Sequence, residues 1–359
     1  MIGKKILDKE SSYKIDKDNV YGSVLALPEQ ILSIWKQTED LKISDELKEI
    51  DKIVVAGMGG SALGARVIKS LAGKELKVPL EIVNDYHLPG YADENTLVIL
   101  SSYSGNTEEV LEAAKESVAT GCKNYVITTG GELFKMAQDN DWPIIEIDPV
   151  ENPSDQPRMA IGYSVMAQMS LFNKMGMWNL EPEMIERVIN WLSHQQESWV
   201  KEIEQSKNSA KRLSFQLKDR AAVLIAGDFL QGAVHVFKNQ LNENAKSFAV
   251  RFDIPELNHH LMEGLGKPED LDKKLHFLLF DSKLYEDKIR KRIKVTEEVI
   301  LKQGYEVTRL VVEGKSKFDQ AWEVIQFGEF VSLYLAVLHK INPAPIPWVD
   351  FFKKQIKNG

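Results

Sequence analysis

A glycine-rich turn separates a strand pattern from a helix pattern in the first third of the chain. The apolar residues 53–56 are followed by Gly57-Met-Gly-Gly-Ser61, and apolar residues then recur at helical spacing from Leu63 to Leu71. Because glycine has no Cβ, its backbone turns tightly and can approach a ligand closely. The unpaired N–H groups and the positive dipole end of the following helix favour an anion. The turn is therefore a candidate phosphate-binding loop.

The same turn allows two other interpretations. Its glycine spacing also matches the dinucleotide fingerprint G-x-G-x-x-[GA], in which Asp85, after the second predicted strand, would bind the ribose. A tight strand-to-helix turn without a ligand is the other interpretation. The Walker phosphate-binding pattern is excluded, since no Gly-Lys-Ser or Gly-Lys-Thr follows. The turn alone leaves a sugar phosphate, a dinucleotide and no ligand open.

Four hydroxyl side chains gather at a second junction of strand and helix. Ser101, Ser102, Ser104 and Thr107 stand where one strand pattern ends and the next helix pattern begins. Together with the free N–H groups of that helix, these hydroxyls can surround the oxygens of a phosphate without any cation. Helix capping accounts for one or two of the hydroxyls but hardly for four. Since a dinucleotide fold does not need such a cluster, the junction favours a sugar phosphate.

Several short motifs carry a family resemblance over nearly the whole chain. Ser102-Tyr-Ser-Gly-Asn-Thr-Glu108 resembles the signature of the sugar isomerase (SIS) domain, and with Gly57–Ser61 it resembles the phosphate cradle of that superfamily. One such motif would be a weak signal, whereas six in series are specific. The series resembles the bifunctional phosphoglucose/phosphomannose isomerase family, and its other four members are Gln156-Pro-Arg158-Met-Ala, Asn242-Glu243-Asn, Pro255-Glu-Leu-Asn-His259 and Val349-Asp-Phe-Phe-Lys353.

The resemblance implies an isomerase that converts glucose 6-phosphate, mannose 6-phosphate or both to fructose 6-phosphate without a metal or another cofactor. Such a reaction removes a proton from the carbon next to a carbonyl and returns it one carbon away. It requires a carboxylate base, a proton donor for the ring oxygen and a cation near the developing enediolate. The phosphate of the substrate is then expected at Gly59, Gly60, Ser61, Ser102, Ser104 and Thr107.

Glu243 and Arg158 are the residues expected to act on the carbon skeleton. In the family, the glutamate at the position of Glu243 moves the proton between C1 and C2; an ordinary surface glutamate is the alternative interpretation. Arg158 can stabilise an enediolate without taking the catalytic proton, because a guanidinium does not lose its charge. A salt bridge to Asp155 or Glu151 is the alternative for this arginine.

His259 and Lys353 are expected to assist ring opening. A histidine near its ordinary pKa of ~6.5 both donates and accepts protons at neutral pH. In the family, the histidine at the position of His259 comes from the adjacent subunit, so the resemblance implies a homodimer; a surface role is the alternative for His259 and for its neighbour His260. Ala344 stands where the family often has a threonine, which leaves the preference between glucose and mannose open.

The elements that must position these residues follow an α/β pattern. Nearly continuous apolar strands such as Leu97–Leu100 are typical of parallel sheets covered by helices on both faces. The resemblance implies two SIS-type doubly wound domains, each a mainly parallel sheet flanked by helices. The first covers residues 1–175, of which 1–50 form a helical segment. The second covers residues 176–359, with a helical connector at 182–217 and a C-terminal helix.

Periodicity alone predicts the individual elements. The run from Ala222 to Gly227 is similar to that from Ile53 to Gly57, which suggests an internal repeat of one α/β unit. In the first half, the predicted strands are 52–56, 80–84, 96–101, 124–128 and 144–147, and the predicted helices are 62–72, 108–120 and 133–139. In the second half, the predicted strands are 221–227, 248–252, 276–280 and 306–312, and the predicted helices are 231–242, 286–303 and 327–338.

The composition limits the kinds of molecule that the protein is expected to bind. Of the 359 residues 43% are hydrophobic and 27% are charged, as in a globular protein, and the formal net charge of −8 argues against nucleic-acid binding, which needs a basic face. Cys122 is the single cysteine, so an intrachain disulfide framework and a multi-cysteine metal site are excluded. The sequence shows no apolar run of membrane-spanning length and no signal-peptide core, so we expect a cytoplasmic protein without a membrane segment.

Two other functions stay open at this point. SIS domains also serve in non-catalytic regulators that sense sugar phosphates, although those usually carry a helix-turn-helix domain. The joint presence of Glu243, His259 and Arg158 favours catalysis over that alternative. An NAD-dependent oxidoreductase is the other possibility, and it would bind its dinucleotide through Asp85.

Overall fold

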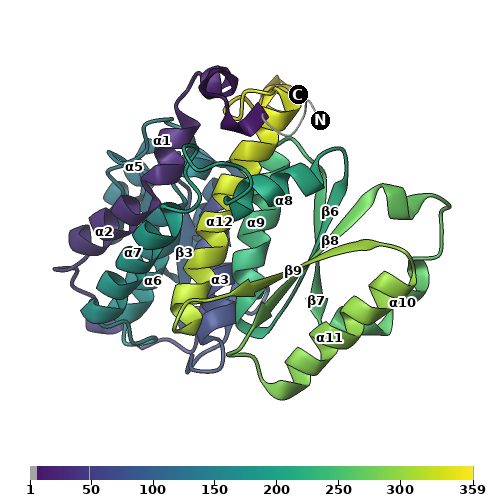
Figure 1. Cartoon of the computed structure of the whole chain (residues 1–359). Helices are drawn as coiled ribbons and strands as arrows, with labels where there is room; N and C mark the ends of the chain where they lie inside the picture. Colours follow the sequence, from purple (N-terminus) through teal and green to yellow (C-terminus); the bar gives the residue numbers. More distant parts are fainter. Residues whose placement is uncertain (1–5, 48, 359) are drawn as a thin grey trace.

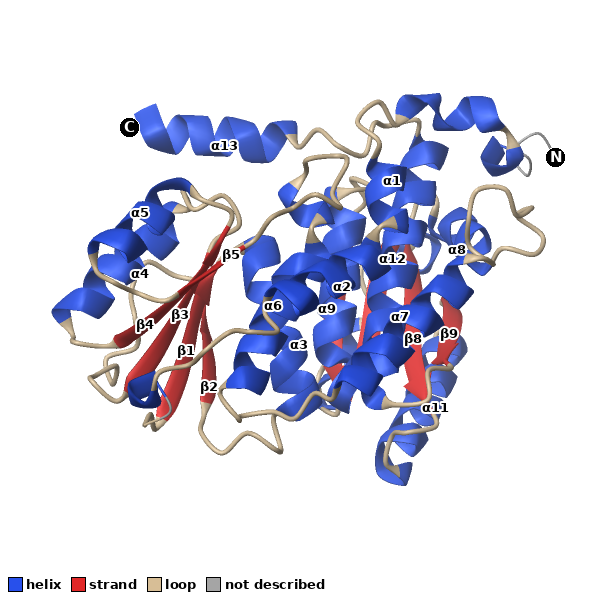
Figure 2. Ribbon diagram, turned by 90° about the vertical axis from the view of Figure 1, so that its left-hand side faces the viewer, coloured by secondary structure: helices blue, strands red, loops and turns tan. Residues whose placement is uncertain are grey.

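Two parallel β-sheets with a layer of helices between them form the body of the protein (Figure 1, Figure 2). The computed structural model describes residues 6–47 and 49–358. Part of the predicted helical segment, residues 1–5 and 48, lies outside the described residues. The α/β architecture with two sheets is the one predicted from the sequence.

The first sheet has five parallel strands in the order β2-β1-β3-β4-β5. Successive residues of a strand point to opposite faces, and both faces are covered. Ile53 and Leu97 pack with α3 and α6, whereas Val54 and Val98 pack with α4 and α5. The strands are β1 (Lys52–Gly57), β2 (Leu80–Val83), β3 (Thr96–Ser101), β4 (Lys123–Thr128) and β5 (Ile144–Glu146), and the helices are α3 (Leu63–Ala72), α4 (Glu108–Ala119), α5 (Gly131–Asp139) and α6 (Ile161–Lys174).

The strand order places a topological switch point between β1 and β3. The chain leaves β1 to form β2 on one side and returns to form β3 on the other. In open α/β sheets, ligands bind in the crevice outside the carboxyl ends of the strands at such a point. Both predicted phosphate turns, Gly57–Ser61 and Ser102–Thr107, follow these two carboxyl ends.

The second sheet repeats this arrangement with four parallel strands in the order β7-β6-β8-β9. As β1 does in the first sheet, β6 lies between the next two strands of the chain, which agrees with the internal repeat seen in the sequence. The strands are β6 (Ala221–Gly227), β7 (Ala249–Ile254), β8 (Leu275–Ser282) and β9 (Glu306–Val312), and the helices of this half are α9 (Gln231–Glu243), α10 (Leu261–Gly264), α11 (Asp287–Lys302) and α12 (Lys317–His339).

Helices from both halves of the chain form the layer between the sheets (Figure 2). In this layer α3, which follows the central strand β1, contacts α9, which follows the central strand β6. The helix α9 also packs along α12. The N-terminal helices α1 (Val20–Leu25) and α2 (Leu27–Gln37) cover α12 and α6 respectively. The predicted connector 182–217 consists of α7 (Pro182–Gln196) and α8 (Ser209–Leu217), and both pack on α12. The layer therefore brings the start of α3 close to the end of α9.

The core helix α12 begins ten residues earlier than the periodicity predicts. Ser316 and Asp319 form a capping box at its start, and polar residues interrupt the apolar pattern of its first turns. These polar groups are buried and paired: Asp319 with Arg187, and Gln320 with the Ser282 hydroxyl. The helix is long and apolar enough to cross a membrane, but the apolar part is completely buried in the fold. It is a core helix of this α/β body.

The last helix, α13 (Pro347–Asn358), stands away from the body (Figure 2). A short segment, residues 340–346, joins it to α12. Short 3-10 helices complete the described chain, and several of them shape the site described next. They are η2 (Glu10–Ile15), η3 (Asp45–Leu47), η4 (Gly59–Ala62), η5 (Pro157–Met159), η6 (Asp228–Leu230), η7 (Glu256–His259) and η8 (Leu271–Lys273).

Candidate active site

The glycine turn leads from β1 through η4 into α3 with its glycines facing open space. Gly59 has a φ of +50°, which glycine adopts without strain. A Cβ built at Gly59 or Gly60 would meet no atom within 4 Å. Ser61 Oγ accepts a hydrogen bond of 3.0 Å from the Tyr103 N–H, so this turn is tied directly to the hydroxyl turn after β3.

The hydroxyl turn has a bend that only glycine permits. Gly105 has a φ of +65°, and a Cβ there would lie 1.8 Å from the carbonyl oxygen of Gly130. The Ser102 and Thr107 hydroxyls lie 2.8 Å apart, and Ser104 is exposed. Thr107 is the N-cap residue of α4, but its side chain accepts no hydrogen bond from the first turn. Capping therefore does not account for the Thr107 hydroxyl.

A glutamine on α6 connects the two turns by hydrogen bonds. Gln168 Nε2 donates to the Ser61 carbonyl at 2.7 Å and to the Ser101 hydroxyl at 3.2 Å. Ser101 is buried and points away from the exposed side of the turn, unlike Ser104. The sequence did not single out Gln168, because it lies on a continuously buried helix with no motif of its own.

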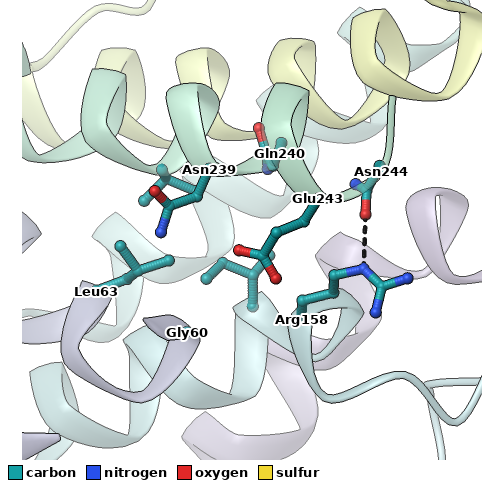
Figure 3. Close-up of a pocket in the computed structure, with 9 residues that line it drawn as sticks. Gly60, Leu63, Arg158, Asn239, Gln240, Glu243 and Asn244 are labelled. Atoms are coloured by element: carbon teal, nitrogen blue, oxygen red, sulfur yellow. Dashed lines mark hydrogen bonds between the residues drawn. The ribbon is translucent and has the colours of Figure 1, made fainter. Parts of the chain in front are cut away.

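Three of the residues expected at the site line one pocket (Figure 3). Gly60 comes from the glycine turn, Arg158 from η5 and Glu243 from the last turn of α9. The pocket contains about 280 Å³ of space free of atoms, part of it open to solvent. Figure 3 shows the Glu243 side chain directed between the Gly60 turn and Arg158. Asn239 and Asn244 also line this space and were not assigned from the sequence.

Glu243 is a half-buried carboxylate surrounded by cations. Burial raises its pKa above the ordinary value, while the charges of Arg158, Lys238 and Lys246 lower it, and the net effect is upward. A carboxylate whose pKa is raised towards the operating pH is a stronger base than one at the surface. The environment of Glu243 is therefore suited to proton abstraction.

Arg158 is held by neutral oxygens alone within the described part of the chain. Its Nε donates to Asn244 Oδ1 at 2.9 Å, and its Nη2 donates to the carbonyl of Pro343 at 2.9 Å and to that of Ala344. Its Nη1 donates to Gln156 Oε1 at 3.1 Å. The alternative of a salt bridge to a neighbouring carboxylate is not what the structure shows. The guanidinium is fixed in place by hydrogen bonds to neutral groups, so its charge can stabilise an oxyanion.

The Lys246 ammonium is a second cation close to Arg158 and Glu243. The sequence analysis assigned it no role. Its ammonium donates to the same Pro343 carbonyl as Arg158 does, and to the Asn244 carbonyl at 3.4 Å. Burial lowers the pKa of Lys246 to about 8, and the charge of Arg158 adds to this effect while Glu243 opposes it. The signal in the sequence that could have pointed to Lys246 is its position three residues after Glu243.

His259 lies apart from this pocket in its own chain. Ala249, the first residue of β7, is hydrogen-bonded to Asn242 beside Glu243, whereas His259 follows the other end of that strand. A strand of six residues spans roughly 17 Å. His259 is exposed and does not line the pocket. The structure therefore does not bring His259 and Glu243 of one chain together.

Lys353 and Asp85 are both exposed. Lys353 lies on α13, close enough for its charge to lower the pKa of Glu243. Asp85 follows β2, and its carboxylate accepts a hydrogen bond from the Tyr86 N–H at 2.6 Å. Ala344, the position that differs from the family pattern, is buried, and its carbonyl accepts a hydrogen bond from Arg158.

Comparisons with known proteins agree with this arrangement. A model described as the SIS domain matches residues 46–175, and one described as the bacterial phospho-glucose isomerase C-terminal SIS domain matches residues 206–356. In the fold alone, the chain is similar to the solved structure of tagatose-6-phosphate ketose/aldose isomerase from Escherichia coli. Its TM-score is 0.70 at 15% identity, covering 90% of this chain and 94% of that one.

Two relatives are similar over most of their length. Bifunctional phosphoglucose/phosphomannose isomerase from Caldicellulosiruptor bescii is 33% identical, covering 94% of this chain and 98% of the relative. The protein of the same name from Thermoplasma acidophilum is 32% identical, covering 85% of this chain and 89% of the relative. The motifs, the two sheets and these full-length matches agree, and the chain belongs to the bifunctional phosphoglucose/phosphomannose isomerase family.

Proposed function

We propose that the protein is an isomerase that interconverts glucose 6-phosphate or mannose 6-phosphate with fructose 6-phosphate. The observation that carries the proposal is the single pocket in which Glu243, Arg158 and Gly60 meet. A base, a fixed cation and a candidate phosphate turn are the parts that an enediolate mechanism needs. Relatives named phosphoglucose/phosphomannose isomerase over nearly the whole length support the same reaction.

The two turns after β1 and β3 would hold the phosphate. Their hydroxyls and backbone N–H groups lie at the start of two helices, where the helix dipoles favour an anion. The hydrogen bond between Ser61 and Tyr103 joins the turns into one surface. The residues proposed to bind the phosphate are Gly59, Gly60, Ser61, Ser102, Ser104 and Thr107.

Glu243 would transfer the proton once the sugar ring is open. Its carboxylate takes the proton from C2 of the aldose, and the electron pair moves to the carbonyl oxygen at C1. The resulting cis-enediolate carries its negative charge beside Arg158, which stabilises it. Glu243 then returns the proton to C1, and the proton of O2 passes to O1 as the ketone forms at C2. In the reverse direction, the face of C2 that receives the proton decides whether glucose 6-phosphate or mannose 6-phosphate forms.

Ring opening would use Lys353 of the same subunit and His259 of the adjacent subunit. Because His259 lies beyond the far end of β7 from Glu243 of its own chain, His259 would reach this pocket from a second chain. We therefore propose a homodimer with two shared sites, and two domains that meet near residue 175. We also propose a cytoplasmic location, which fits an enzyme that acts on hexose phosphates.

An assay with purified protein tests the function. Incubation with glucose 6-phosphate or mannose 6-phosphate in the presence of EDTA should produce fructose 6-phosphate, because none of the proposed steps uses a metal. Formation of no fructose 6-phosphate from either substrate, by protein that still binds it, would favour a non-catalytic sugar-phosphate sensor. Binding of NAD(H) would instead favour an oxidoreductase that uses Asp85.

A further inference from the structure

The end of α9 carries an amide side chain that the rest of the protein leaves free. Three of the four amides there donate hydrogen bonds to other parts of the chain: Gln240 to the Ile325 carbonyl at 3.1 Å, Asn242 to the Ala249 carbonyl at 3.0 Å and Asn244 to the Ser332 hydroxyl at 3.2 Å. The fourth, Asn239, makes no side-chain hydrogen bond with any residue that the structure describes. Since an amide has both donors and an acceptor, the hydrogen-bonding capacity of Asn239 is available to a ligand.

Asn239 lines the same pocket as Glu243, on the other side of Glu243 from Arg158 (Figure 3). Its side chain is half-buried, and Figure 3 shows it directed toward Leu63, which follows the glycine turn. Asn239 precedes Glu243 by four residues on α9. The two side chains therefore share one face of the helix and start about 6 Å apart along its axis. Asn239 faces the part of the pocket between the glycine turn and Glu243.

The other residues of the pocket wall leave Asn239 as the uncharged side chain that can pair with a ligand. Leu63, Ile161 and Val236 are apolar, and the donors of Gln240 and Asn244 are bonded within the protein. A hydroxyl group that leaves water for such a wall without a partner loses its hydrogen bonds at a cost. Because a hydroxyl both donates and accepts, an amide can replace the water that it gives up.

A hexose 6-phosphate would lie in this part of the pocket with the middle of its carbon chain. The mechanism proposed above places the phosphate at the glycine turn and carbons C1 and C2 at Glu243, with the enediolate charge beside Arg158. The carbons C3 to C5 connect these two ends. Since Asn239 lies on the glycine-turn side of Glu243, the hydroxyl groups within its reach are those of C3 and C4.

We propose that Asn239 binds the hydroxyl group at C3 or C4 of the hexose phosphate and is a specificity-determining residue of this site. The inference rests on the proposed function, because it takes the positions of the phosphate and of C2 from that mechanism. A site that hydrogen-bonds a hydroxyl discriminates against an analogue that lacks it, since its own polar group is then left unpaired. Asn239 would thus select the sugar at a carbon that the reaction does not change.

The test combines Asn239→Leu with glucose 6-phosphate and its 3-deoxy and 4-deoxy analogues. Leucine has nearly the shape of asparagine but forms no hydrogen bond, so we expect kcat/KM for glucose 6-phosphate to fall about 30-fold. The wild type should lose a similar factor with one of the two analogues. With that analogue, the variant and the wild type should differ by about threefold or less, because the partner of Asn239 is already absent. Asn190→Leu, at an exposed position of α7, is the matched control and should leave all three values unchanged.

Three results would overturn the inference. Asn239→Leu could isomerise glucose 6-phosphate as efficiently as the wild type. It could also lose the same factor with glucose 6-phosphate and with both analogues, as a purely structural defect would cause. Finally, the wild type could bind none of the three sugar phosphates.

Failure of the proposed function alone looks different, because the wild type would bind glucose 6-phosphate without forming fructose 6-phosphate. The same comparison is then made with dissociation constants from calorimetry. A loss of affinity in Asn239→Leu that disappears with one deoxy analogue would support the inference even without turnover, and equal losses with all three ligands would overturn it.

Discussion

At the scale of single residues, the fold disfavours the charged form of Glu243. Burial raises its pKa, so the charged carboxylate is less stable in the folded protein than in the unfolded chain. A group whose folded pKa is raised contributes its stability at low pH and loses it as the pH rises through that pKa. Such a destabilised group in a pocket is typical of a catalytic base.

Glu243→Gln should therefore stabilise the protein at neutral pH. We expect the free energy of unfolding to rise by roughly 1 kcal/mol at pH 7.5 relative to the wild type, and the difference to shrink as the pH falls and the carboxyl group takes up its proton. Urea unfolding at pH 7.5 and at lower pH measures this. The exposed Glu298 on α11 is the control, and Glu298→Gln should change little. A Glu243→Gln variant that is less stable than the wild type at pH 7.5 would contradict the electrostatic argument.

Arg158 should influence both the rate and its pH dependence. Arg158→Gln removes the fixed charge beside the enediolate, and we expect kcat/KM to fall about 100-fold or more. The charge of Arg158 also lowers the pKa of Glu243, so the acid limb of the kcat/KM profile should move to higher pH in the variant. Lys246→Met should move the limb in the same direction with a smaller loss of rate. Unchanged acid limbs in both variants would show that Glu243 is not the base.

At the scale of elements, the hydroxyl turn depends on a glycine that cannot be replaced. Gly105→Ala would place a Cβ 1.8 Å from the Gly130 carbonyl oxygen at a φ of +65°. Gly121 has a similar φ of +72° but nothing within 4 Å, so Gly121→Ala carries the backbone strain alone. In urea unfolding, we expect Gly121→Ala to lower the free energy of unfolding by about 1 kcal/mol and Gly105→Ala by about 3 kcal/mol or more. Equal effects would mean that the turn has room to relax.

The elements near the two candidate phosphate turns could be predicted because their signals are local. Each of the central strands β1 and β3 is a short apolar run that ends in glycine or serine, and β3 was predicted residue for residue. The start of α12 could not be predicted in this way. Its first turns bury polar groups such as Asp319 and Gln320, whose partners lie far away in the sequence.

The same distinction holds within the site. Glu243 and Arg158 stand in recognisable motifs, and the structure lines one pocket with both. Asn244 and Lys246 act through contacts with Arg158 and Pro343, which lie about 90 residues before and 100 residues after them. The residues next to Asn244 and Lys246 in the sequence do not indicate partners so far away along the chain. The role of His259 stays a prediction, because it depends on a second chain.

At the scale of the whole molecule, the pocket forms where the two halves of the chain meet. Gly60 and Arg158 come from the first half and Glu243 from the second, and contact between α3 and α9 sets their separation. In the proposed dimer, His259 of the second chain would join Gly60, Arg158 and Glu243 at the pocket. Neither half of the chain then contains a complete set of catalytic groups.

Mixed dimers test whether His259 acts between subunits. Glu243→Gln and His259→Asn should each be inactive as pure dimers. When the two variants are coexpressed, half of the dimers are mixed, and each mixed dimer contains one site with both groups intact, so about a quarter of the sites should be active. The control is coexpression of Glu243→Gln with Arg158→Gln, which share no group across chains. No recovery in the first pair would mean that His259 does not serve the site of another chain.

The central claim is that Glu243 carries the proton between C1 and C2 of a bound hexose phosphate. Its most direct test is solvent exchange: fructose 6-phosphate is incubated with the protein in D2O, and deuterium at C1 is followed by proton NMR. The wild type should exchange this position during turnover, and Glu243→Gln should exchange it at least 1,000-fold more slowly while it still binds the substrate. Exchange at the wild-type rate in Glu243→Gln would contradict the account.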